Sequence, residues 1–136
     1  MPVEFKSVER RNPQQNDAPP KYYAQIVQKE RVKIKEMAAD IADISTVSEV
    51  DIAAVLSALV KMVPKYLAKG RPVKLGDLGT FSLSLKAEGV DTEDKVTAHT
   101  ISGNKVNFRA GQEVRNQLKL ATYAKAKSEK EEEETV

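Results

Sequence analysis

The chain has 136 residues, of which 40% are hydrophobic, 31% charged and 5% aromatic. This length and composition are typical of one domain with an aliphatic core, and they exclude a disordered or membrane-embedded chain. The sequence contains no cysteine, which excludes disulfides, thiolate metal sites and a cysteine nucleophile. It also lacks a secretory signal and any run of about 18 apolar residues. We therefore expect a cytoplasmic protein without a membrane partner.

The net charge of +2 is unevenly distributed along the chain. Residues 127–136 hold two lysines and five glutamates, for a local charge of −3, whereas residues 1–126 carry 20 basic and 15 acidic side chains, for a charge of +5. A positively charged body with an acidic, low-complexity tail is compatible with a polyanionic partner, although an inert solubilising tail has the same pattern. We expect the tail to be disordered.

Two short strands are expected at the N-terminus. Residues 3–10 place apolar side chains among charges, and residues 21–28 alternate in a similar way. Residues 11–20 between them are rich in Asn, Gln and Pro, which is typical of a loop. The sequence therefore predicts a β-hairpin with a long tip, in which residues 1–29 form an N-terminal extension.

Two helices are expected next. Apolar residues recur at spacings of three and four over residues 30–44, which predicts the first helix. The segment Thr46-Val47-Ser48-Glu49 has the form of a capping box, with the Thr46 hydroxyl accepting from the Glu49 amide, so the second helix is expected to begin there. Gly70 is a residue type that often closes a helix, and Pro64 is expected to weaken its last turns.

The periodicity changes from helical to alternating after Gly70. Residues 71–75 and 80–85 alternate around a glycine-containing turn, which predicts a β-hairpin with its apolar side on the helices. Residues 86–104 are polar. Residues 105–108 then predict a returning strand, and residues 111–120 predict a short terminal helix.

The order of these elements resembles the HU and integration host factor family of histone-like DNA-binding proteins. The segment 70–81, which ends in Gly79-Thr80-Phe81, is similar to that family's signature of a strand, a glycine turn and Gly-Thr-Phe. Residues 108–111, Phe-Arg-Ala-Gly, are similar to its closing Phe-x-Pro-Gly, with alanine where proline is usual. The resemblance implies an α+β, HU-like domain over residues 30–126. The extra N-terminal hairpin is similar to that of a divergent branch from Bacteroidetes-type bacteria.

The resemblance also implies a function. Members of this family are intertwined dimers whose two long β-arms enter the minor groove of double-stranded DNA. For this chain we expect a homodimer that binds duplex DNA with little sequence preference. Apolar wedges at the arm tips unstack a base step and hold a bend. Binding of this kind rests on phosphate neutralisation and DNA deformability. We therefore expect a nucleoid-associated protein that binds and bends DNA and uses neither a cofactor nor a small-molecule substrate.

The sequence departs from the family in the region of the arm. Residues 86–105 lack the family's Arg-Asn-Pro tip and hold three lysines against four acidic residues, for a charge of −1. A negatively charged arm is repelled by phosphate. The tripeptide occurs instead in the N-terminal loop as Arg11-Asn12-Pro13, after Arg10. Pro13 could act as a wedge with Arg10 and Arg11 as minor-groove cations, and a polar turn that happens to contain proline is the alternative.

The candidate DNA-binding residues are basic side chains in three regions, together with this proline. For the four basic residues from the end of the second helix to the next strand, residues 65–74, a solvated protein surface is an equally good explanation. In chain order the candidates are Arg10, Arg11, Pro13, Lys65, Lys69, Arg71, Lys74, Lys86, Lys95, Lys105 and Arg109.

No motif in the sequence indicates an enzyme. His99 is the sole histidine, without a neighbouring carboxylate to orient it, and no phosphate-binding glycine loop or metal-spaced cluster is present. The main alternative is an HU-fold homodimeric scaffold that has lost DNA binding and contacts another protein. A helix-turn-helix repressor is less compatible with the sequence, because the second helix leads into strands and leaves no separate recognition helix.

Overall fold

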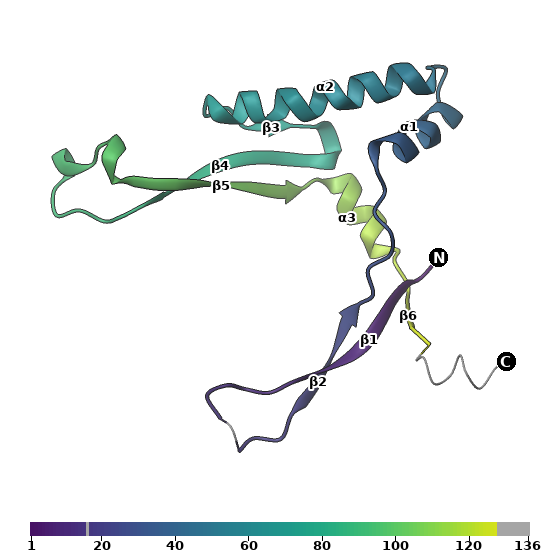
Figure 1. Ribbon diagram of the computed structural model, residues 1–136, viewed down its shortest axis with the longest axis horizontal. Coiled ribbons are helices and arrows are strands. Elements are labelled where there is room, and N and C mark those ends of the chain that lie inside the picture. The colour runs from purple at the N-terminus through teal and green to yellow at the C-terminus, as the bar shows by residue number, and fades with distance from the viewer. Residues whose placement is uncertain (16, 128–136) are drawn as a thin grey trace. The chain divides into compact units, whose positions relative to one another are not determined.

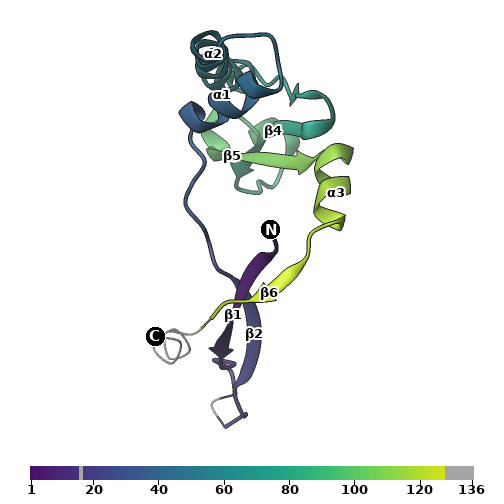
Figure 2. The same cartoon turned by 90° about the vertical axis from the view of Figure 1, so that its right-hand side faces the viewer.

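The computed structural model of the protein describes residues 1–15 and 17–127. The chain divides into two compact units, shown in Figures 1 and 2. The helical unit comprises Val32–Leu118, and the terminal unit combines Met1–Arg31 with the segment from Lys119 onward. The acidic tail predicted over 127–136 lies outside the described residues, apart from Lys127. Among the described residues, no helix is long and apolar enough to cross a membrane.

The helical unit contains the α+β elements that the sequence predicts. Its three strands form an antiparallel sheet in the order β3-β4-β5. The returning strand is longer than expected, because a polar stretch assigned to a loop pairs with the end of β4. The elements are α1 (Ile34–Asp43), α2 (Glu49–Ala68), β3 (Val73–Lys74), β4 (Gly79–Ala87), β5 (Ile101–Ala110) and α3 (Gln112–Lys119).

The beginning of α2 differs from the prediction, whereas its end agrees with it. Ser48 caps the helix by accepting from the Asp51 N–H at 3.3 Å, so the expected cap by Thr46 is wrong. Both sites offer a hydroxyl followed by an acidic residue, but Ser48 directly precedes the first helical residue. Gly70 has φ of 75° and ends the helix. Its N–H donates to the Leu67 carbonyl, and the next N–H donates to the carbonyl of Tyr66, as in a Schellman motif.

One side of the β3-β4-β5 sheet packs toward α2. Phe81, Leu83 and Val106 line a shallow hollow together with Val63 and Leu67 of the helix. In both views the helices α1 and α2 lie on the same side of the β4–β5 hairpin (Figures 1 and 2). The Phe81 ring also lies 4.9 Å from that of its strand partner, Phe108. The apolar side of the predicted hairpin therefore does face the helices.

Two glycines allow the close contacts at the base of this sheet. Gly79 has φ of 152°, and a Cβ there would lie 2.6 Å from the Phe108 ring. A Cβ on Gly111 would lie 2.1 Å from the carbonyl oxygen of Asp77, and the Gly111 N–H donates to the Leu78 carbonyl at 2.9 Å. Gly79 of one family-like segment and Gly111 of the other are thus required by steric contact.

The terminal unit is a three-stranded sheet in the order β2-β1-β6. It consists of β1 (Val3–Arg10), β2 (Lys21–Ile26) and β6 (Tyr123–Lys125). The first two strands form the expected hairpin. The sequence did not predict β6, which runs parallel to β1 and is held by hydrogen bonds from the Val3 N–H to the Thr122 carbonyl and from the Ala126 N–H to the Phe5 carbonyl.

Replacing Gly111 with alanine should destabilise the protein, because the new methyl group overlaps the backbone of Asp77. We expect Gly111→Ala to lower the free energy of unfolding by about 1–3 kcal/mol. Gly89→Ala is the matched control, since a Cβ there meets nothing within 4 Å, and its effect should stay below about 0.5 kcal/mol. Urea unfolding at one fixed protein concentration measures both changes. Equal stability of the two variants would contradict the close contact.

Candidate nucleic-acid interface

The register of β4 with β5 places basic and hydroxyl side chains on one side of the sheet. Side chains that face each other across antiparallel strands share a side, and successive side chains along a strand alternate. The side opposite to the Phe81–Phe108 pair is here called the polar face. Its side chains are Lys74, Thr80, Ser82, Ser84, Lys86, Lys105, Asn107 and Arg109. None of the three strands contains an acidic residue.

Hydrogen bonds link the two strands across the polar face. The Asn107 amide donates to the Ser84 hydroxyl at 2.9 Å, and the Ser84 hydroxyl donates to the Lys105 carbonyl at 3.4 Å. Asn107 is half-buried, whereas the four basic side chains of the face are exposed. Exposed lysines and arginines beside hydroxyl and amide groups are the side chains that contact phosphate oxygens in protein–DNA interfaces.

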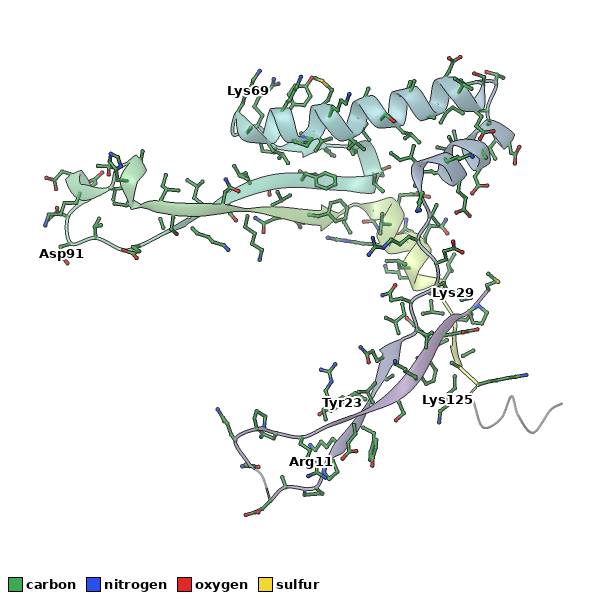
Figure 3. All side chains as sticks on the ribbon, in the orientation of Figure 1. Arg11, Tyr23, Lys29, Lys69, Asp91 and Lys125 are labelled. Atoms are coloured by element: carbon green, nitrogen blue, oxygen red, sulfur yellow. The ribbon has the colours of Figure 1, made fainter. Side chains whose placement is uncertain are left out.

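The acidic residues of the arm lie at its tip. Glu88 and Asp91 follow the end of β4, and the short 3-10 turn Glu93–Lys95 holds two more acids together with Lys95. Figure 3 shows Asp91 at the far end of the arm. The charge of −1 over residues 86–105 is therefore the sum of a positive charge on the two strands and a larger negative charge at the tip. Of the predicted arm residues, Lys86 and Lys105 lie on the polar face and Lys95 does not.

A polar hollow of about 340 Å³ lies at the base of the polar face. Lys74 and Arg109 line it from the sheet, and Gln112 and Arg115 line it from the first turns of α3. The sequence analysis missed Arg115, although its position three residues after Gln112 places both on one side of a helix. Asp77 is the one acidic residue in this lining.

The three candidates around the end of α2 do not lie on the polar face. Lys65 and Lys69 belong to the last turns of α2 and the residue that follows it, and Figure 3 shows Lys69 at that end of the helix. The Arg71 guanidinium lies 5.3 Å from the centre of the Tyr66 ring, a cation–π distance. These residues are exposed, but they come from the helix side of the sheet.

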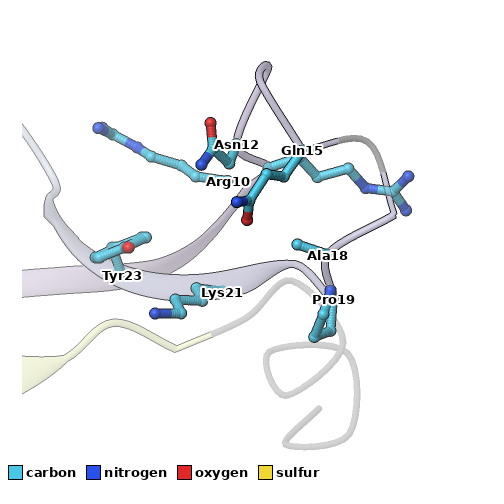
Figure 4. Close-up of a pocket in the computed structure, with 8 residues that line it drawn as sticks. Arg10, Asn12, Gln15, Ala18, Pro19, Lys21 and Tyr23 are labelled. Carbon is cyan, nitrogen blue, oxygen red and sulfur yellow. The ribbon is translucent and has the colours of Figure 1, made fainter.

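The remaining candidates lie in the hairpin of the terminal unit. Arg10 faces Lys21 across the strands, and its guanidinium lies 6.0 Å from the centre of the Tyr23 ring. Arg11 instead forms an exposed ion pair with Glu9 at 3.5 Å. These strands and their loop enclose a hollow of about 390 Å³, shown in Figure 4.

Pro13 occupies the second position of a β-turn in the hairpin loop. The turn is closed by a hydrogen bond from the Gln15 N–H to the Asn12 carbonyl at 3.2 Å. The Asn12 side chain also accepts from the Gln14 N–H at 3.0 Å. Proline is favoured at this position because its fixed φ matches the turn. The local role of Pro13 in the turn is thus explained without a ligand.

Comparisons with known proteins agree with the geometry. The HU-HIG family model, described as an HU domain fused to wHTH, Ig or glycine-rich motifs, matches residues 1–125. No curated protein matches the chain. A solved structure from Bacteroides vulgatus ATCC 8482, described as a "Putative bacterial DNA binding protein", is similar with a TM-score of 0.60 and 15% identity. The match covers 90% of this chain and 48% of that one, so the chain spans about half the length of its solved relative. At this identity the likeness to the solved structure shows a common fold. The family match extends over nearly the whole chain. The protein therefore belongs to the HU-HIG family of HU domains.

Proposed function

We propose that this protein binds duplex DNA with little sequence preference and bends it, as an architectural dimer of a bacterial chromosome. The observation that carries the proposal is the polar face, on which three strands without any acidic residue present four exposed basic side chains. Membership of an HU family supports it. The organism and description of the solved relative also support a place in the Bacteroidetes-type branch and a DNA partner.

Binding through the polar face has a simple electrostatic basis. Lys74, Lys105 and Arg109 neutralise phosphates and release counterions, and the hydroxyl and amide groups between them donate to phosphate oxygens. The acidic tip is repelled by phosphate, so the strands rather than the tip make the main contact. The polar face consists of strand side chains suited to phosphate oxygens, and selectivity then rests on DNA deformability. Arg10 and Arg11 of the hairpin provide a second basic contact.

The proposed dimer follows from apolar surface that the helical unit leaves exposed. Ala38, Ile52 and Leu67 are the only buried hydrophobic residues among those described. Val55 on α2 remains 66% exposed and Phe108 on β5 remains 51% exposed. Exposed large apolar side chains in such number are typical of an interaction surface, and a second copy of the chain would cover them.

The proposal includes no catalytic step and no cofactor. Among the described residues, no group of three or more His, Cys, Asp or Glu side chains is placed to hold a metal ion. His99 lies in a short 3-10 turn near the arm tip, in an exposed position. The groups on the polar face are suited to holding phosphate oxygens and include no nucleophile paired with a base.

A homodimeric protein scaffold is the second candidate function, and one observation favours it. The β2-β1-β6 sheet has an apolar side with Val3, Phe5, Tyr22, Ile26 and Tyr123, and the last three of these are exposed. Among the described residues of the terminal unit, no second layer covers this side. An exposed apolar sheet face is typical of a protein-binding surface. The two functions differ in a simple respect, because only the first requires affinity for DNA.

The protein should be a stable dimer at micromolar concentration, because a monomer exposes Val55 and Phe108. Sedimentation equilibrium is expected to give twice the chain mass of 15.0 kDa. A species of 15.0 kDa that persists throughout the micromolar range would reject the dimer.

DNA binding should weaken steeply with salt. We expect a linear fall of the logarithm of the association constant with the logarithm of salt concentration, with a slope near −0.9 per neutralised phosphate. Gel shifts with linear, nicked and pre-bent duplexes over a range of salt concentrations measure this slope and the preference for bent DNA. If none of these duplexes shifts even at low salt, the scaffold function is favoured.

The position of a lysine, rather than its charge alone, should decide its effect on binding. Lys74→Ala with Lys105→Ala removes two cations from the polar face, and we expect the salt slope to flatten by up to about two units. The control pair, Lys61→Ala with Lys95→Ala, removes the same charge from exposed positions on α2 and at the arm tip. It should change the slope by much less. Equal losses in both double variants would show that the polar face is not the contact surface.

A further inference from the structure

We infer that the hollow in the N-terminal hairpin binds one unpaired nucleotide of a DNA strand. The inference rests on the proposed function, since it assigns a further ligand feature to a DNA-binding chain. The hollow is formed by the ends of β1 and β2 together with Arg11, Asn12, Gln15, Ala18 and Pro19 from the segment between them. Its volume of about 390 Å³ lies in the range of small-ligand sites.

The first supporting observation is an uncompensated pair of like charges. Arg10 and Lys21 face each other directly across the antiparallel strands. Like charges in such a pair destabilise a hairpin, so folding alone does not favour this arrangement. Among the described residues, none of the side chains that line the hollow is acidic, and the nearby Glu9 pairs with Arg11 instead. A bound anion such as a phosphate would offset the repulsion between Arg10 and Lys21.

The second observation is an aromatic ring beside these two cations. Tyr23 lies on the same side of β2 as Lys21, and it remains 50% exposed. Tyr23 and Lys21 extend from β2 and Arg10 from β1, and all three line the hollow shown in Figure 4. The Arg10 guanidinium is at the outer limit of cation–π contact with this ring, so a base can still stack there.

The third observation is a set of polar groups above the ring. Asn12 and Gln15 line the hollow from the loop, and their carboxamides can donate to and accept from the edge of a base. Proteins that bind single strands use cations to contact the phosphate and an aromatic ring to stack on the base. Amide groups can in addition hydrogen-bond the edge of the base. A sulfate or a free phosphate would use only the cations.

The geometry favours a nucleotide outside a duplex. Bases within a helix are stacked on both sides and cannot present a face to Tyr23, whereas strand ends, flaps and gaps can. The polar face of the helical unit contacts backbone phosphates whether or not bases are paired. The hairpin therefore adds a preference for DNA with unpaired ends to the general affinity of the polar face.

Two tryptophan variants of the full chain test this inference. The chain has no tryptophan, so Tyr23→Trp and the control Tyr22→Trp each introduce a single fluorophore. The two positions are adjacent on β2 and therefore lie on opposite sides of the sheet. The probes are a blunt duplex of about 20 base pairs and the same duplex with about six unpaired thymidines at one 3′ end. The tailed probe should quench the tryptophan fluorescence of Tyr23→Trp, and neither probe should quench that of Tyr22→Trp.

Affinity measurements complete the test. Tyr23→Ala should weaken binding of the tailed duplex by about 5-fold to 150-fold, the range measured for loss of one stacking contact. It should leave the blunt duplex unaffected, and Tyr22→Ala should affect neither probe. Equal quenching of both tryptophans, or equal wild-type affinity for the two duplexes, would overturn the inference while leaving duplex binding intact. Binding of the tailed probe with no binding of the blunt one would instead reject the proposed duplex function and retain the pocket.

Discussion

The register between β4 and β5 is the constraint on which the helical unit depends. A shift of one residue would turn every side chain of one strand to the other side of the sheet. The register is held at the base of the arm, where Gly79 lies under the Phe108 ring and Gly111 lies against the backbone of Asp77. The same contacts that seat Phe81 toward α2 therefore direct Lys105 and Arg109 away from it. Packing on one side and charge on the other follow from a single set of steric contacts.

The two units use this alternation in similar ways. In the hairpin of the terminal unit, the pairing of Arg10 with Lys21 brings two cations to one side, while Phe5 and Ile26 face the other. Both sheets thus separate an apolar side from a basic one. The two sheets differ in how the apolar side is covered. In the helical unit α2 packs on that side, whereas the described part of the terminal unit contains no helix of its own and only one sheet. That exposed side explains why a protein partner is a reasonable second function for the same chain.

The sequence predicted the order of elements well, because long periodic segments and glycine turns are local signals. The bounds of β1 agree with the predicted ones, and Gly70 ends α2 as expected. The strand β6 could not be predicted, because three residues are too few for an alternating pattern and their partner lies at the other end of the chain. The first residues of β5 were assigned to a loop, since Ser102, Gly103 and Asn104 are typical of turns. In the structure they pair with β4, where a polar strand side faces solvent.

The candidate site shows more clearly what one-dimensional reasoning omits. A net charge for residues 86–105 does not say where along the arm each charge lies. The strands keep the basic side chains at the base of the arm far from the acidic side chains at its tip. The eight steps from Gly79 to Ala87 extend roughly 25 Å, which exceeds the Debye length of about 8–10 Å at physiological salt. Arg109 at the base of the arm is therefore screened from the acids at the tip, whereas Lys86 is close to Glu88.

The arm carries a gradient from positive charge at its base to negative charge at its tip. A phosphate backbone is therefore attracted to the base of the arm and repelled from its end. Charge distribution, rather than net charge, thus determines where a duplex would lie on this fold.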